Sequence, residues 1–179
     1  MSPLVGAVNQ ILSILTIIAQ ILIIGLIIVI LLKKSKISDF IGRHGILLTF
    51  IVVLTATLGS LFYSEIAGFE PCKLCWFQRI LMYPQAILLG MALLKKDKNI
   101  GDYSLGLSVP GVIIAGYHYL LQLGVAPTFS CSVVGYSAHC SQGFVMNFGY
   151  ITIPLMAFSA FLLIILIQLI KRGYNKKAV

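Results

Sequence analysis

The sequence predicts an all-α integral membrane protein: a four-helix transmembrane bundle with one extra N-terminal transmembrane helix. Hydrophobic residues make up 59% of the 179 residues and charged residues only 10%, whereas about a quarter of the residues in a soluble domain are charged. The apolar residues gather in five runs of about 20 residues, the length that crosses a bilayer. Twelve of the thirteen Lys and Arg residues lie outside these runs, and eleven of them lie in three short basic stretches between or after the runs.

Each run can form a helix that satisfies its own backbone in lipid. The runs are Val8–Leu32, Gly45–Ser64, Trp76–Leu94, Leu105–Gly124 and Gly149–Ile170. Arg79 and His118 are the only charged or imidazole side chains within them, so few polar groups enter hydrocarbon. The first run ends at two lysines rather than at a small-residue cleavage site, so we expect it to be retained. Pro84 and Pro154 are expected to kink their helices.

The cations between the runs predict a single orientation. The basic segments Lys33–His44, Lys95–Asp102 and Lys171–Val179 belong in the cytoplasm by the positive-inside rule. The N-terminus and two loops, Glu65–Cys75 and Val125–Phe148, then face outward. The net charge of +8 therefore reflects membrane topology, and we expect no nucleic-acid partner.

All four cysteines lie in or beside the two outward loops. Cys72 and Cys75 form a Cys-x-x-Cys pair after Pro71, a sequence that favours a helix start, where the helix dipole stabilises a thiolate. The compartment and the spacing together favour redox chemistry. A chance pair, a static disulfide and half a zinc site remain alternatives. The zinc site would be completed by Cys131, Cys140 and His139, but eight residues separate its two cysteines, which is unusual for zinc ligands.

Two further side chains are candidates for binding a lipid-soluble quinone, and a third is a candidate for a functional role. Arg79 lies one helical turn after Cys75, where a fixed cation would stabilise negative charge on a quinone oxygen; the alternative is an arginine that snorkels to the headgroups. Gln78 is a second possible donor, unless it faces a neighbouring helix. His118 lies near the outer end of its run, and is either functional or part of an interfacial aromatic belt with the tyrosines beside it.

Cys131 and Cys140 lie in the long second outward loop, which is rich in Ser and Gly. A mobile pair there could take electrons from a soluble thiol protein and approach the first pair, because thiol exchange requires close contact between sulfurs. An ordinary loop disulfide is the alternative.

These residues carry a recognisable resemblance. The segment Cys72-Lys-Leu-Cys75-Trp76-Phe77-Gln78-Arg79, followed by Tyr83-Pro84, resembles the Cys-x-x-Cys-(aromatic)-x-(Gln/Glu)-Arg signature of DsbB-type disulfide-bond formation proteins, nearest their BdbC branch. Further similar segments are Gly59–Glu65, Tyr117–Gln122 and Phe148–Leu155, so the resemblance covers about His44 to Ile170.

The resemblance implies a quinone-dependent thiol oxidase in a bacterial-type cytoplasmic membrane. Such a protein reoxidises a DsbA-like extracytoplasmic thiol oxidase and passes electrons to ubiquinone or menaquinone. Cys72 and Cys75 would be the quinone-coupled pair, and Cys131 and Cys140 the pair that meets the soluble partner. Arg79 would be the cation beside the quinone, and His118 matches a family histidine near that site.

The resemblance also divides the chain into three regions. Residues 1–43 are an additional helix and a basic loop, 44–170 the DsbB-like bundle, and 171–179 a basic tail. The additional helix and the short spacing of the second cysteine pair depart from the family pattern. A vitamin K epoxide reductase-like enzyme is disfavoured, because in that family the loop pair precedes the Cys-x-x-Cys pair. A non-catalytic membrane subunit with two inert disulfides remains an alternative.

Overall fold

The computed structural model describes residues 3–32, 35–97, 99–125, 140 and 143–177. These residues form five long α-helices and a short π-helical turn, η1 (Phe62–Ile66), that continues the second of them. The α-helices are α1 (Pro3–Leu31), α2 (Ser35–Leu61), α3 (Lys73–Lys95), α4 (Ile100–Gln122) and α5 (Ile153–Lys177). Each is long and apolar enough to cross a membrane. The predicted fold class is therefore confirmed: this is an all-α, multi-pass membrane protein.

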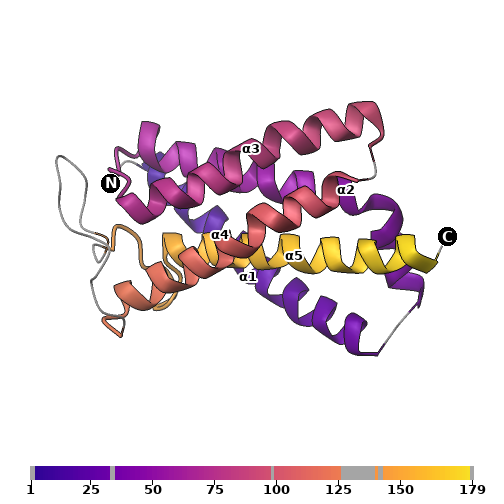
Figure 1. The fold of residues 1–179 in the computed structure, drawn as a ribbon. Helices are drawn as coiled ribbons and strands as arrows, with labels where there is room; N and C mark the ends of the chain where they lie inside the picture. The colour runs from indigo at the N-terminus through magenta and orange to yellow at the C-terminus, as the bar shows by residue number, and fades with distance from the viewer. Residues whose placement is uncertain (1–2, 33–34, 98, 126–139, 141–142, 178–179) are drawn as a thin grey trace.

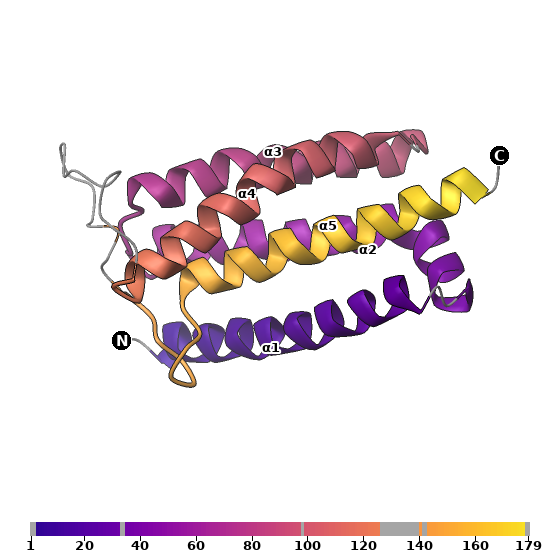
Figure 2. The same ribbon diagram turned by 60° about the horizontal axis from the view of Figure 1, so that its bottom comes forward.

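Helices α2 to α5 close a ring, and α1 lies outside it. Within the ring, α2 packs against α3 and α5, and α4 packs against the same two helices. Helix α1 packs along α5 and makes only slight contact with α2 (Figure 2). The N-terminus and the α2–α3 connection lie at one end of the molecule, and the C-terminus lies at the other (Figure 1). We call these the cysteine end and the basic end.

Two helix boundaries differ from the apolar runs. Helix α2 begins at Ser35 rather than Gly45, because the basic stretch before the run is itself helical. Helix α5 begins at Ile153, because Phe148 and Gly149 adopt positive φ angles of 52° and 79° that a helix does not permit.

The two prolines behave differently. Pro84 lies inside α3, where the expected kink stays a prediction. The expectation that Pro154 kinks a helix is wrong: it is the second residue of α5, a position where the missing N–H would have no helical partner.

The bundle core is apolar and closely packed. Phe161 of α5 lies against Gly111 of α4, where a Cβ atom would collide with the phenyl ring. The surrounding core comprises Val53, Met82, Leu89, Ala115 and Ile164. The outer faces instead expose many large aliphatic side chains, as expected of surfaces in contact with lipid.

Candidate functional site

The Cys-x-x-Cys pair begins α3, as predicted. Cys72 is the N-cap residue, and its Sγ accepts a hydrogen bond from the backbone N–H of Cys75 at 3.4 Å. The two sulfur atoms lie 3.1 Å apart, and both residues are free thiols. Cys72 is buried and Cys75 is half-buried. Backbone donors at a helix start favour the thiolate form of an N-cap cysteine.

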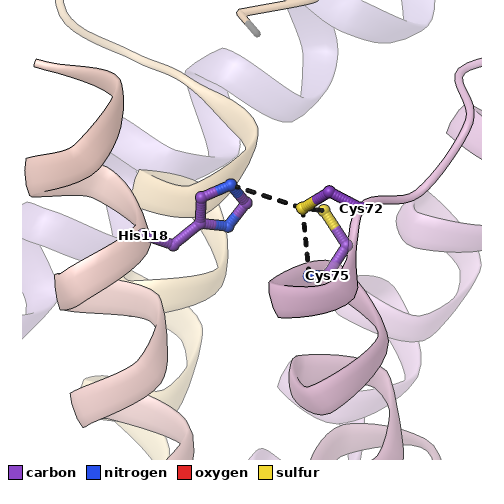
Figure 3. A group of neighbouring side chains, drawn as sticks. All are labelled: Cys72, Cys75 and His118. Carbon is purple, nitrogen blue, oxygen red and sulfur yellow. Dashed lines mark hydrogen bonds between the residues drawn. The ribbon is translucent and has the colours of Figure 1, made fainter. Parts of the chain in front are cut away.

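His118 projects from α4 onto this pair (Figure 3). Its Nε2 atom lies 3.6 Å from the Sγ of Cys72 and 3.1 Å from the backbone carbonyl oxygen of Cys140. Because a carbonyl oxygen can only accept, Nε2 carries a proton and donates it. The side-chain amide of Gln78 donates to Nδ1 at 3.0 Å, which leaves that nitrogen as the acceptor. The imidazole is thus held in one tautomer, with its N–H directed toward the sulfur.

The environment of Cys72 favours the thiolate. The hydrogen bond from the Cys75 thiol is the largest influence, burial opposes it, and the His118 imidazole adds a further hydrogen bond. Together they lower the pKa of Cys72 well below the ordinary value of a thiol. A cysteine with a lowered pKa is a thiolate over more of the neutral range, and such a sulfur is both reactive and a good leaving group.

Arg79 is anchored inside the protein. Its Nε donates to the Oγ of Ser60 at 3.1 Å, and its Nη2 donates to the carbonyl oxygen of Ser60 at 3.2 Å. The Tyr83 hydroxyl donates to the same Ser60 Oγ at 3.0 Å. The guanidinium also lies over the rings of Trp76 and Tyr83, with its carbon 5.4 and 6.0 Å from their centroids. These contacts fix the position of the cation one turn below Cys75.

A cavity of about 370 Å³ joins these groups. Its polar wall contains Cys72, Cys75, Gln78, Arg79 and His118. Most of the remaining wall is apolar and comes from α1, α2 and α5. This combination of a large apolar wall and a few convergent polar groups is typical of a small-molecule site.

Cys140 lies beside the first pair. It is buried and disulfide-bonded, and it packs in one apolar cluster with Cys72 and Leu121. Cys131 and His139 lie outside the described residues. A disulfide-bonded Cys140 cannot ligate a metal through a thiolate, so the zinc site considered above loses one of its ligands.

The structure brings Cys72, Cys75, Gln78, Arg79 and His118 to one site. Gln78 faces α4, where it contacts His118, and it also lines the cavity, so its role as a donor to a ligand stays a prediction. His118 is only 2% exposed, so it is not part of an interfacial belt. Its nitrogen atom and the two sulfurs lie within 4.8 Å of one another, a spacing that a metal ion would also accept.

The role of Ser60, which anchors Arg79, was not evident from the sequence. Its only signal was its position in the segment Gly59–Glu65, which resembles a family motif. The contribution of α1 to the cavity was also missed, because a uniformly apolar helix does not reveal which face will meet a ligand.

Comparison with known proteins agrees with these observations. Residues 42–170 match the family model "Disulfide bond formation protein DsbB". Disulfide bond formation protein C of Bacillus subtilis strain 168 is 41% identical over 130 residues, which cover 70% of this chain and 90% of that protein. The probable disulfide formation protein C of Halalkalibacterium halodurans is 41% identical over 122 residues, covering 68% and 88% of the two chains.

A prophage-derived relative extends the comparison. The SPbeta prophage-derived disulfide bond formation protein B of Bacillus subtilis is 47% identical over 118 residues, covering 66% of this chain and 78% of that protein. No solved structure gives a significant match. The matched region includes the cysteine pair, the arginine, the histidine and the glutamine of the site. The chain therefore belongs to the DsbB family of disulfide bond formation proteins.

Proposed function

We propose that this protein is a membrane thiol oxidase that reoxidises a DsbA-like extracytoplasmic thiol oxidase and passes the electrons to a membrane quinone, either ubiquinone or menaquinone. One observation carries the proposal: a Cys-x-x-Cys pair with a stabilised thiolate borders an apolar cavity that also contains an anchored arginine. An inert disulfide requires neither the cavity nor the arginine.

The proposed reaction is a relay of two electrons. A dithiol of the partner exchanges with the Cys131–Cys140 disulfide, so that the partner gains a disulfide and this pair becomes two thiols. A second exchange moves the disulfide bond back from Cys72–Cys75 to Cys131–Cys140 and leaves Cys72 and Cys75 as thiols. Oxidation of these thiols to a disulfide then releases two electrons and two protons, which the quinone takes up when bound.

The residues of the cavity fit a quinone. The apolar wall suits a ring and an isoprenoid tail, and the Arg79 guanidinium lies where a carbonyl oxygen would need a positive partner. His118 serves the sulfur instead, because its Nε2 proton is directed at Cys72 and at the Cys140 carbonyl. Proximity of Cys140 to Cys72 supports direct exchange between the two pairs.

The proposed orientation places the cysteine end outside the cytoplasm. The partner must reach the cysteines in a compartment where disulfides persist. The start of α2 and the ends of α3 and α5, which carry basic residues, lie at the opposite end, and this supports a cytoplasmic location for them.

Replacement of Arg79 by alanine tests the proposal. We expect kcat/KM for quinone to fall about a hundredfold, the loss typical when one donor to a developing negative charge is removed. The rate of thiol exchange with a DsbA-like substrate should stay within about twofold of the wild-type rate. This rate is measured by alkylation in a single turnover without quinone, and a chelator is present so that no metal ion blocks the cysteines.

Lys73→Ala is the matched control, because it removes a cation between the two cysteines that does not line the cavity. It should leave the dependence on quinone concentration unchanged. Equal losses in both variants would assign Arg79 only a general electrostatic effect. If both cysteine pairs stayed oxidised with and without quinone in wild-type protein, the pairs would be inert and the proposed function would be wrong.

A further inference from the structure

We propose that α1 forms one wall of the quinone site and holds the isoprenoid tail of the quinone in a groove between α1 and α2. This inference rests on the proposed function and extends it to a helix that lies outside the matched family region, residues 42–170. It assigns specificity for the tail to residues of this additional helix.

The cavity itself is the first reason. Six residues of α1 line it: Leu12, Leu15, Thr16, Ile18, Ala19 and Leu22. At 1.5 Å per residue, this stretch runs about 15 Å along the helix, from the level of the cysteine end toward the middle of the bilayer. On the facing side, Ile51, Val52, Thr55, Ala56 and Gly59 of α2 line the same cavity. Helix α5, between Ile153 and Leu163, lines the cavity as a third wall. The cavity is therefore a long apolar space rather than a single pocket at the cysteines.

The packing of α1 explains why this space exists. Helix α1 packs on α5 and barely touches α2, so the two helices are separated along most of their length. Leu12 of α1 lies against Gly59 of α2, where a Cβ atom would lie 3.2 Å from the Leu12 side chain. Gly59 precedes Ser60, the residue that anchors Arg79. The groove thus begins beside the polar head of the cavity and extends away from it.

A buried polar cluster fixes α1 in this place. Asn9 of α1 donates to the side-chain oxygen of Asn147 at 3.2 Å and accepts from the Tyr63 hydroxyl at 2.9 Å. The Asn147 amide donates to Ser13 at 2.7 Å. Ser13 is fully buried and Tyr63 is 4% exposed. Hydrogen bonds between helices set the register of membrane helices, so α1 has a defined position relative to the bundle.

The polarity of the cavity favours one occupant. Polar groups meet at one end, and aliphatic side chains line the groove that leads away. A molecule with a polar ring and a long apolar tail matches this distribution. A phospholipid with two acyl chains and a bulky headgroup matches it less well, because the polar groups are few and most of the lining is apolar.

Photolabelling of wild-type protein in lipid nanodiscs tests the inference directly. The probe is a quinone with a diazirine group on its isoprenoid tail, close to the ring. We expect labelled peptides from α1 between Leu12 and Leu22, and excess unlabelled quinone should suppress the labelling. Labelling confined to α2–α5, or labelling that unlabelled quinone does not reduce, would overturn the inference.

A variant supplies an independent readout. Ala19→Phe fills the groove, and Ile21→Phe adds the same ring to a side chain that is 63% exposed and does not line the cavity. Binding is followed by quenching of Trp76, the only tryptophan in the chain, whose ring contacts Arg79. For a long-tailed quinone, we expect Ala19→Phe to weaken binding about tenfold, as if about two methylene groups were no longer buried. Ile21→Phe should bind normally.

A quinone with the same ring and no tail separates the possible failures. Ala19→Phe should bind it within about twofold of wild type, since the ring site is intact. Equal weakening for both quinones would mean that the variant disturbs the fold, and the photolabelling result alone would then decide. If neither the long-tailed nor the tailless quinone bound to wild-type protein, the proposed function would be wrong. If both quinones bound, but Ala19→Phe did not weaken binding of the long-tailed quinone, only the role of α1 would be wrong.

Discussion

Helix α3 carries two buried glutamines, two turns apart, that face α4 in very different surroundings. Gln78 donates to His118, which in turn contacts the reactive sulfur of Cys72, and it lines the cavity. Gln85 donates to the carbonyl oxygen of Leu81 at 2.9 Å, and its side-chain oxygen accepts from Ser104 at 2.6 Å. Gln85 does not line the cavity.

The difference shows what separates a structural polar contact from a functional one in this bundle. Gln85 is satisfied at both ends of its amide by groups that do not titrate in the physiological range. Its hydrogen bonds join α3 to α4 and specify their register. Gln78 instead contacts His118, which contacts the Cys72 sulfur, and it borders the cavity that a ligand can enter. Burial alone does not distinguish the two residues, because both are less than a tenth exposed.

Among these changes, replacement of His118 by phenylalanine should have the largest effect, because it removes the link between Gln78 and the Cys72 sulfur. In wild-type protein, the alkylation rate of Cys72 should be constant at neutral pH and fall only in acid, as the pH drops through the lowered pKa of its thiol. A lowered pKa means that the thiolate exists above that value and is lost below it. Without the imidazole, we expect the midpoint to rise by at least about one unit, and turnover to fall about a hundredfold.

His44→Phe is the control for this experiment, since His44 is an exposed histidine of α2 that bonds only to the carbonyl oxygen of Phe40 among the described contacts. Its pH profile should coincide with that of wild type. An unchanged midpoint in His118→Phe would show that His118 does not tune the sulfur, and would remove the proposed distinction between Gln78 and Gln85.

Replacing each glutamine by leucine compares the two positions directly. Gln85→Leu leaves the Ser104 and Ser108 hydroxyls without their acceptor, so we expect a loss of about 1–2 kcal/mol in unfolding free energy and an unchanged pH profile. Gln78→Leu frees the imidazole from its fixed tautomer, so the pH profile should shift upward. Stability is measured by unfolding in mixed micelles, and the profile by alkylation. Identical patterns in the two variants would contradict the comparison.

The sequence predicted which residues of α3 lie together at this site better than it predicted the contacts between helices. Cys72, Cys75 and Arg79 were predictable because their spacing on one helix fixes their relative positions without tertiary information. The contact between His118 and Gln78 was not predictable, because it depends on how α3 and α4 are rotated about their axes. Apolar periodicity gives little information about rotation when lipid and protein faces are equally hydrophobic.

The first residues of two helices were also harder to predict than the presence of the helices. The apolar runs identified all five helices, but hydropathy did not detect that α2 extends through the basic stretch to Ser35. Helix α5 begins later than the apolar run, because Phe148 and Gly149 adopt positive φ angles. The apolar composition alone had placed Gly149 inside the span. Local stereochemistry, rather than hydrophobicity, decides such boundaries.

Helix α2 offers a second pair of polar residues on which the comparison can be sharpened, with smaller expected effects. Ser60 holds Arg79 at the cavity, whereas Thr49 accepts a hydrogen bond from Gln168 at 2.7 Å inside the bundle.

Ser60→Ala removes one of the two hydrogen bonds that Ser60 accepts from Arg79, so KM for quinone should rise about threefold. This rise corresponds to the loss of one hydrogen bond of about 0.6 kcal/mol. Thr49→Val should leave KM unchanged and lower the unfolding free energy by about 1 kcal/mol. Steady-state quinone reduction and micellar unfolding measure the two quantities. If Thr49→Val raised KM as much as Ser60→Ala, proximity to the cavity would not be what makes a buried polar residue functional here.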